Sequence, residues 1–300
     1  MRCRTPLVLA LFAALTAVGC GGADASVAMS GKSATSLPQE ASTDPKRVVS
    51  ISTVATEMLF AIGAGPQVVA VDSMSNFPVG APVTDLSGYE PNVEAILGYE
   101  PDLVVLSYDP GDVVAALETA GVTTLMQGAA SSIEESYAQI ADLGTATGRA
   151  AEAVDLVTQM QAQIDSLTNS VVQRDNPLTY FHELDDNLFT VTSKTFIGEI
   201  YSLAGLINVA DPADADGSSW GYPQLSAEYL LNADPDLIFL ADTKCCAQNA
   251  ATVITRPGWE SLTAVRNNHI FELDDDVASR WGPRLVDFLR LIVDAVNSRK

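Results

Sequence analysis

The sequence predicts an α/β protein with two similar lobes, each built on a mainly parallel sheet, joined by one long backbone helix. The first observation is a duplication: residues 94–106 (EAILGYEPDLVVL) are echoed 134 positions later by residues 228–240 (EYLLNADPDLIFL). Each copy reads as a short helix, a Pro-Asp turn and a buried strand. The second observation is the alternation of strand-like and helix-like stretches around both copies, which favours parallel sheets covered on both faces. The third is a proline-free stretch between the copies, residues 132–172.

The first lobe is expected over residues 46–130. Short apolar runs predict strands, and helical spacing of apolar residues predicts helices, one of which is stopped by Gly63 and Gly65. In addition to the repeat, the expected strands are 47–51, 67–71 and 122–126, and the expected helices are 56–62 and 112–120.

The connection between the lobes is expected over residues 131–173. An apolar stripe at helical spacing predicts one long helix; it consists of Ala150, Val154, Val157, Ile164, Leu167 and Val171. Gly144 and Gly148 stand where the beginning of this helix can break or kink. About 24 helical residues extend about 36 Å, enough to run along both lobes and to oppose large hinge motion.

The second lobe, residues 174–300, repeats the plan of the first. A further echo supports this, because residues 57–63 match residues 199–205 in their leading Glu and closing Gly. In addition to the repeat, strands are expected at 177–182 and 269–273, and helices at 193–205, 259–265 and 283–296.

The N-terminus carries an export signal. Residues 1–19 combine two arginines with an apolar run too short to span a bilayer, and they end just before Cys20. Residues 15–20 (LTAVGC) resemble the lipobox of bacterial lipoproteins, which implies cleavage before Cys20 and lipidation of its thiol. An ordinary secretory signal is the alternative. Residues 20–45 hold almost no large apolar side chains, so we predict a flexible tether.

The charge of the chain is strongly acidic. The formal net charge is −22, and removal of residues 1–19 makes it −24, because two arginines and no acids are lost. Such a field excludes nucleic acid as a natural partner and disfavours highly anionic ligands unless a local basic patch meets them. Solubility alone, or an acidic or saline habitat, is the simpler explanation for the excess of acid.

Several motifs resemble the substrate-binding proteins of ABC importers for ferric siderophores and cobalamin. They are RVVS at 47–50, TEMLFAIG at 56–63, PNVEAIL at 91–97, EPDLV at 100–104 and PGWESL at 257–262. The resemblance implies an exported lipoprotein on the outer face of the membrane that captures a ferric siderophore or corrinoid and delivers it to permease subunits. It implies no intrinsic cofactor, no resident metal and no catalytic residue.

The same resemblance implies a role for the glutamate that begins each copy of the repeat. In the family, a glutamate near the top of each lobe forms salt bridges with permease arginines, and Glu94 and Glu228 match those positions. A local explanation also exists. Each glutamate lies in the first turn of an expected helix, after Asn92 or Ser226 as a cap, where the helix dipole favours acid.

Loops that follow the carboxyl ends of parallel strands are expected to form the ligand cleft. Their aromatic side chains suit the flat faces of a bulky chelate. The candidates are Tyr89, Tyr108, Lys194, Trp220, Tyr222, Arg280 and Trp281. Tyr222 and Arg280 match cleft positions of cobalamin binders, whereas Gly88-Tyr89 stands in place of the family's first-lobe tryptophan. Arg280 and Lys194 can meet a ligand carboxylate or pair with the acids 274–276 instead.

Two further features allow more than one interpretation. Cys245 and Cys246 are adjacent in an exported chain, which allows a strained vicinal disulfide that shapes the pocket; thiolate metal binding is the alternative. His182 ends an expected strand, where it either faces the cleft as a haem ligand or is hydrogen-bonded internally. The rival functions are a haem receptor, a tethered sensor and an enzyme. The enzyme is the less favoured alternative, because the sequence contains no phosphate-loop, Gly-x-Ser-x-Gly, dinucleotide-glycine or zinc-helix motif.

Overall fold

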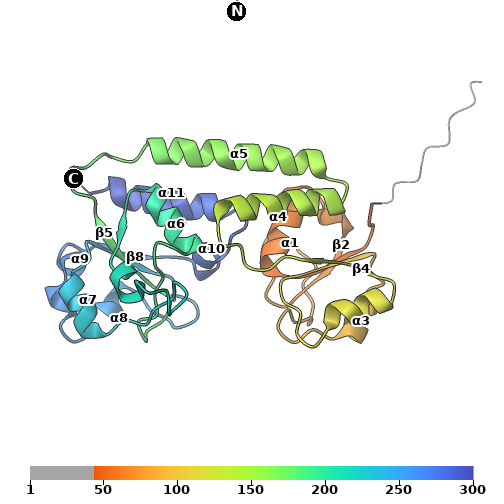
Figure 1. The fold of residues 1–300 in the computed structure, drawn as a ribbon, viewed down its shortest axis with the longest axis horizontal. Helices are drawn as coiled ribbons and strands as arrows, with labels where there is room; N and C mark the ends of the chain where they lie inside the picture. Colours follow the sequence, from red (N-terminus) through yellow and green to blue (C-terminus); the bar gives the residue numbers. More distant parts are fainter. Residues whose placement is uncertain (1–43, 300) are drawn as a thin grey trace, which may run out of the picture. The chain divides into compact units, whose positions relative to one another are not determined.

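The computed structural model describes residues 44–299 and contains two four-stranded sheets of parallel strands (Figure 1). Their orders correspond, β2-β1-β3-β4 in the first lobe and β6-β5-β7-β8 in the second. The strands are β1 (Val48–Ile51), β2 (Val68–Val71), β3 (Leu103–Leu106), β4 (Thr123–Met126), β5 (Thr179–Glu183), β6 (Ile207–Asn208), β7 (Leu237–Leu240) and β8 (Ile270–Glu272). The shared order confirms the predicted fold class of two similar α/β lobes.

Helices cover the sheets because the central strands β1, β3 and β7 are buried along their whole length. In the first lobe they are α1 (Thr53–Ala61), η1 (Gly65–Gln67), α2 (Val93–Leu97) and α3 (Val113–Thr119). In the second lobe they are α6 (Phe196–Leu203), η2 (Asp211–Asp214), α7 (Ala227–Ala233), α8 (Ala250–Val253), η3 (Trp259–Ser261), α9 (Thr263–Arg266), α10 (Asp275–Ser279) and α11 (Leu285–Asn297). The short elements β6, α8 and α10 were not predicted, since two to five residues carry too little periodicity.

The repeated unit folds in the same way in both lobes. The first copy forms α2 and then β3, and the second forms α7 and then β7. Asn92 and Ser226 cap the two helices, accepting hydrogen bonds from the amides of Ala95 at 3.0 Å and Tyr229 at 3.1 Å. Both predicted caps are confirmed.

The connection contains two helices, α4 (Ile133–Ala146) and α5 (Ala150–Asn169), where one long helix was predicted. The break falls at Gly148, whose φ of +69° belongs to the left-handed region and ends α4. Gly144 instead stays helical, because a Cβ there would lie 2.5 Å from the Cβ of Ala153 on α5. Glycine at that position lets the two helices pack closely.

The helix α5 is the backbone that joins the lobes. Its 20 residues extend about 30 Å, and it packs against α4 of the first half and α11 of the second (Figure 1). Arg174, just beyond α5, fastens the return to the second lobe by donating to the carbonyls of Val296 at 2.8 Å and Arg299 at 2.6 Å.

The largest hydrophobic core extends through both lobes. It includes Met58 on α1, Ile140 on α4, Ile164 on α5, Ile200 on α6 and Ile292 on α11, all buried. Each sheet also packs against a smaller core on its other face. Because the lobes share apolar packing as well as a helix, separating them would expose buried surface, which opposes wide opening.

Candidate functional site

A cavity of about 310 Å³ lies where the carboxyl ends of the first sheet meet the second lobe. Residues after β1, β2 and β3 form one side, and residues 276–281 form the other. The structure brings together four of the seven predicted cleft residues on this cavity: Tyr89, Tyr108, Arg280 and Trp281. We refer to it as the cleft cavity.

Two tyrosines form an exposed rim on the first-lobe side of the cleft cavity. Tyr89 is 78% exposed and Tyr108 is 58% exposed, so both rings are available to a bound molecule. Gly88 places its loop against the sheet, because a Cβ at this position would lie 2.6 Å from the carbonyl oxygen of Ile51. A glycine is therefore required beside Tyr89 for the loop to approach β1 so closely.

Trp281 forms part of the wall rather than the rim. Its indole Nε1 donates to Oε1 of Gln139 at 2.9 Å, and its carbonyl accepts a hydrogen bond from the Ser136 hydroxyl. Both partners lie on α4, which packs on the first lobe. These contacts hold the ring in one position and tie the second lobe to α4.

Arg280 lines the cleft cavity but is engaged on all sides by the protein. Its side chain is only 8% exposed and donates to Oε1 of Glu57 at 2.9 Å, Oδ1 of Asn76 at 3.0 Å and Oδ1 of Asp276 at 2.6 Å. The pairing with an acid of the 274–276 stretch, one of the two roles expected for Arg280, is therefore present. The bonds to Glu57 and Asn76 cross to the first lobe.

Arg284 completes this arrangement and was not singled out in the sequence. It donates to Oε2 of Glu57 at 2.8 Å through Nε and to Oε1 at 2.5 Å through Nη2. The Glu57 carboxylate, with 1% of its side chain exposed, thus receives both arginines. Glu57, Asp276, Arg280 and Arg284 form what we call the inter-lobe ion cluster.

The second glutamate of the 57–63/199–205 echo also reaches across the molecule. Oε2 of Glu199, on α6, accepts the amide of Ile133, the first residue of α4, at 3.0 Å. The equivalent positions Glu57 and Glu199 therefore both join the halves of the chain. The echo was the sequence signal for these residues, but it did not reveal their partners.

Lys244 extends the charged region on the second-lobe side. Its Nζ lies 2.7 Å from Oδ1 of Asp274 and 2.8 Å from Oδ2 of Asp276. Burial works against the charge, but the hydrogen bonds to both aspartates raise the pKa of Lys244 above its ordinary value. The ammonium group therefore stays charged, and its charge is balanced by these two aspartates.

The other three predicted cleft residues do not line the cleft cavity. Trp220 is 88% exposed and Tyr222 is 45% exposed, on a loop that bonds to the segment leading into α6 through the Thr192 amide and the Gly221 carbonyl at 2.8 Å. Buried Asp214 supports this loop by accepting the amides of Ser219 and Gly221, both at 2.7 Å. Lys194 is exposed in the same segment.

Trp220 also adopts a left-handed backbone conformation, with φ of +56°. This conformation is unfavourable for a bulky residue and persists only when neighbouring bonds impose it. Here the amides on both sides of Trp220 are bonded to Asp214. The structure thus holds a large apolar ring in solvent.

Cys245 and Cys246 are free thiols after β7, and Cys245 is exposed. The amide of Cys245 donates to Oδ2 of Asp275 at 2.9 Å. Desolvation and the neighbouring Cys246 raise the pKa of the Cys245 thiol to about 12, so Cys245 stays protonated at neutral pH. The vicinal disulfide stays a prediction.

His182 is fully buried and does not line the cleft cavity. Its Nδ1 lies 2.8 Å from the Tyr201 hydroxyl, and its ring contacts Phe288 edge-on. Desolvation lowers the pKa of His182 to about 3, which keeps the imidazole neutral. Of the two roles considered for this residue, the internal hydrogen bond is the one observed.

Glu94 and Glu228 are both exposed in the first turns of α2 and α7. Within residues 44–299 neither carboxylate forms an ion pair. The first-turn position suits the helix dipole, as expected, and leaves each charge available to a partner.

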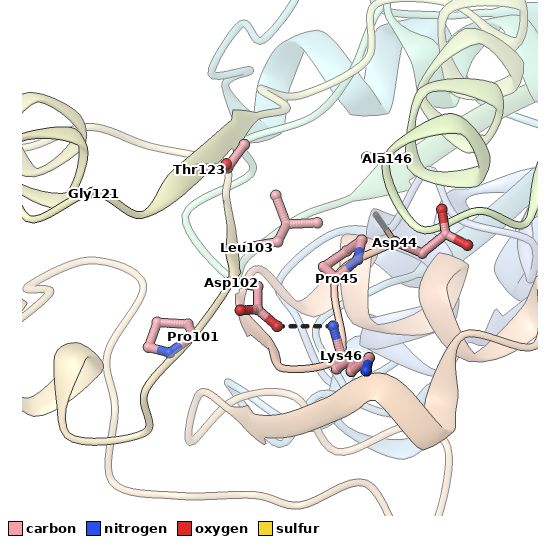
Figure 2. Close-up of a pocket in the computed structure, with 9 residues that line it drawn as sticks. All are labelled: Asp44, Pro45, Lys46, Pro101, Asp102, Leu103, Gly121, Thr123 and Ala146. Carbon is pink, nitrogen blue, oxygen red and sulfur yellow. Dashed lines mark hydrogen bonds between the residues drawn. The ribbon is translucent and has the colours of Figure 1, made fainter. Parts of the chain in front are cut away.

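A larger cavity, about 510 Å³, lies at the opposite edge of the first sheet (Figure 2). Its lining includes residues that precede β1, β3 and β4, among them Lys46, Asp102 and Gly121. Asp102 Oδ2 accepts the amides of Lys46 at 2.9 Å and Arg47 at 3.0 Å. Because sites in parallel α/β folds form at the carboxyl ends of strands, this cavity is not our candidate ligand site.

Three predictions lie mostly or wholly outside the described residues: the signal at 1–19, lipidation at Cys20 and the tether at 20–45, of which only residues 44 and 45 are described. Within residues 44–299, no helix is long and apolar enough to cross a membrane. The same part of the chain contains no group of three or more His, Cys, Asp or Glu side chains placed to hold a metal ion.

Comparison with known proteins agrees with the fold and with the order of the motifs. The chain is 27% identical over 262 residues to the ABC transporter substrate-binding lipoprotein YvrC of Bacillus subtilis, covering 84% of this chain and 80% of that protein. It is 28% identical over 264 residues to a cobalamin-binding protein of Halobacterium salinarum, covering 85% and 70%.

Solved structures show the same architecture. The vitamin B12-binding protein BtuF of Vibrio cholerae superimposes with a TM-score of 0.68 at 24% identity, covering 86% of this chain and 99% of that one. The haem-binding protein RhuT of Roseiflexus gives 0.71 at 24% identity, covering 84% and 99%. Residues 48–277 match the periplasmic binding protein family. The chain therefore belongs to the periplasmic binding protein family.

Proposed function

We propose that this protein binds a metal chelate, either a corrinoid or a ferric siderophore, outside the cytoplasm and delivers it to an ABC transporter permease. The observation that carries the proposal is the cleft cavity between the lobes, with Tyr89 and Tyr108 exposed at its rim. Exposed aromatic faces at a concave site are suited to a large, flat ligand. Trp220 and Tyr222 would add apolar surface from the second lobe.

The relatives support this ligand class and this place in a transport system. One is named a cobalamin-binding protein and another an ABC transporter substrate-binding lipoprotein. By the same reasoning we propose that residues 1–19 are removed, that Cys20 carries the lipid and that residues 20–45 tether the lobes to the membrane.

The first test replaces the rim tyrosines. Tyr89→Ala and Tyr108→Ala are each expected to weaken chelate binding about tenfold, equivalent to about 1.4 kcal/mol, through loss of aromatic contact. Isothermal titration calorimetry of the full chain in detergent, with cyanocobalamin and a ferric hydroxamate as probes, measures the dissociation constants. Leu291→Ala, an exposed apolar substitution on α11, serves as the control and should bind as the unmodified chain does. If no chelate binds below about 10 μM, which corresponds to about 7 kcal/mol, the proposal is wrong.

A second test addresses delivery. We propose that Glu94 and Glu228 orient docking by pairing with cations of the permease. The double variant Glu94→Lys, Glu228→Lys should reduce uptake of labelled ligand by cells about tenfold or more, because each attraction becomes a repulsion. Ligand affinity of the purified variant should be unchanged. The double variant Glu134→Lys, Glu260→Lys, at exposed positions on α4 and η3, makes the same change in net charge and serves as the control. Normal uptake by the double variant would remove the docking role.

A further inference from the structure

The charged groups around the cleft cavity carry an excess of acid. Asp72, Asp276 and Arg280 line it directly, and Glu57, Arg284, Lys244, Asp274 and Asp275 lie in contact with these groups or with one another. This set contains five carboxyl groups against three cations. The local balance therefore has the same sign as the whole chain.

Every cation in this set is already bound to carboxylates of the protein. Arg280 contacts Glu57 and Asp276, Arg284 contacts Glu57 through two bonds, and Lys244 contacts Asp274 and Asp276. Within residues 44–299, Arg280 is the one Lys or Arg side chain that lines the cleft cavity. An anionic ligand would have to compete with Glu57 and Asp276 for the guanidinium of Arg280, and these carboxylates would then keep only Arg284 and Lys244 as cationic partners.

Two of the acids, Asp274 and Asp276, keep their charge in this setting, whereas burial raises the pKa of Asp72 above its ordinary value. Burial acts against ionisation of Asp276, but its hydrogen bonds to Lys244 and Asn76 and the charge of Arg280 lower its pKa below the ordinary value. Asp274 behaves in the same way, since Lys244 outweighs the effect of burial and lowers its pKa. These two carboxylates thus remain negative through the neutral range.

Lys194 does not reverse the balance. It is exposed, does not line the cleft cavity and lies near Asp216. The pKa of Asp216 is lowered, first by the amide and hydroxyl of Ser218 and to a smaller degree by Lys194. The charge of Lys194 is thus opposed by a neighbouring acid of its own lobe.

We infer that the cleft selects chelates by charge, accepting uncharged or cationic metal complexes and rejecting polyanionic ones. This inference rests on the proposed function and narrows it. Corrinoids with amide side chains and ferric hydroxamates meet the condition, because the negative charge of the ligand donors only balances the positive charge of the metal ion or falls short of it. A ferric tris-catecholate with three negative charges and haem with two propionates do not.

Calorimetric titration of the full chain in detergent tests the selection. The probes are cyanocobalamin, a neutral ferric hydroxamate, a cationic ferric hydroxamate and a ferric tris-catecholate. The neutral or cationic complexes should bind at least about tenfold more tightly than the tris-catecholate at low salt. Raising the salt concentration should weaken the cationic complex and strengthen the anionic one, since screening reduces attraction and repulsion alike.

A variant that removes one charge from the cavity wall shows whether ligand selection depends on electrostatics or on the shape of the cavity. Asp276→Asn removes one negative charge from the cavity wall, and Arg280 keeps Glu57 while Lys244 keeps Asp274. The affinity ratio between the cationic and neutral hydroxamates should fall about threefold, and any binding of the tris-catecholate should rise by a similar factor. Asp165→Asn, an exposed acid on α5, is the matched control and should change neither value.

The results of these titrations distinguish a failure of charge selection from a failure of the proposed chelate-binding function. If the tris-catecholate binds as tightly as the neutral complexes, charge selection is wrong and the proposed function stands. Salt-independent affinities, or an Asp276→Asn variant with unchanged affinity ratios, likewise contradict selection by charge. If none of the probes binds, the proposed function fails and this inference fails with it.

Discussion

Replacing Glu57 by Gln should lower the free energy of unfolding by about 3–5 kcal/mol, because the change leaves two partly buried arginines without their shared carboxylate. Glu57 is 1% exposed and accepts three hydrogen bonds, one from Arg280 and two from Arg284. The bond to Glu57 is the main factor that raises the pKa of Arg284 above its ordinary value. Glutamine keeps the size of the side chain but carries no charge and offers only one acceptor oxygen.

Urea denaturation of the full chain in detergent measures this loss. A matched Glu260→Gln variant, which changes an exposed glutamate, should stay within about 0.5 kcal/mol of the unmodified chain. A double-mutant cycle with Arg284→Gln isolates the pair, and we expect a coupling energy above about 1 kcal/mol. A loss below about 1 kcal/mol for Glu57→Gln would show that the inter-lobe ion cluster does not hold the lobes together.

Replacing Asp242 by Asn should stabilise the protein at pH 8 and reduce the pH dependence of its free energy of unfolding. Asp242 follows β7, is fully buried, and its two carboxylate oxygens have no hydrogen-bond partner. Glu183, at the end of β5, is also fully buried and is paired with Arg256 through two bonds of 2.6 Å. Burial, and then the charge of Glu183, raise the pKa of Asp242 to about 7, although Arg256 acts in the opposite direction.

Because its pKa is raised in the folded protein, Asp242 favours folding more at low pH than at high pH. The folded protein holds a proton that an unfolded aspartate releases near pH 4, so Asp242 favours folding fully only below that pH. Its stabilising effect is lost as the pH rises through about 7. The free energy of unfolding should therefore decline between pH 4 and pH 7 by roughly 2–4 kcal/mol from this group.

Urea denaturation at pH 5 and pH 8 tests the assignment. Asp242→Asn should flatten the pH profile in this range, because the amide does not titrate, and should be the more stable form at pH 8. Asp142→Asn, on the exposed face of α4, should leave the profile as it is. An unchanged slope in Asp242→Asn would assign the pH dependence to another group.

The inter-lobe ion cluster also bears on how the protein moves. Glu57 and Arg280 lie 223 positions apart in the chain, one in each lobe. The shared hydrophobic core and α5 add to this connection. Buried ion pairs of this kind favour one arrangement of their elements. The lobes are therefore expected to move little when the ligand enters.

Much of the fold could be predicted because its signals are local. The strand β1, the caps Asn92 and Ser226, and the repeated α2-β3 and α7-β7 units all depend on residues close in sequence. The order of loops in parallel sheets also placed Tyr89 and Tyr108 at the cleft cavity. The break of the connector at Gly148 rather than Gly144 was not decided locally, since Ala153 on the neighbouring helix requires the glycine at 144.

The sequence by itself determined the two-lobed architecture, the exposed glutamates at two helix starts and the aromatic character of the cleft loops. Only the tertiary structure decided which charges meet. Arg280, which the sequence suggests as a ligand contact, donates to Glu57 and Asn76, and His182 is a core residue bonded to Tyr201. The reason is physical: the free energy of an ion pair depends on its distance and burial, and neither is encoded in the neighbouring residues.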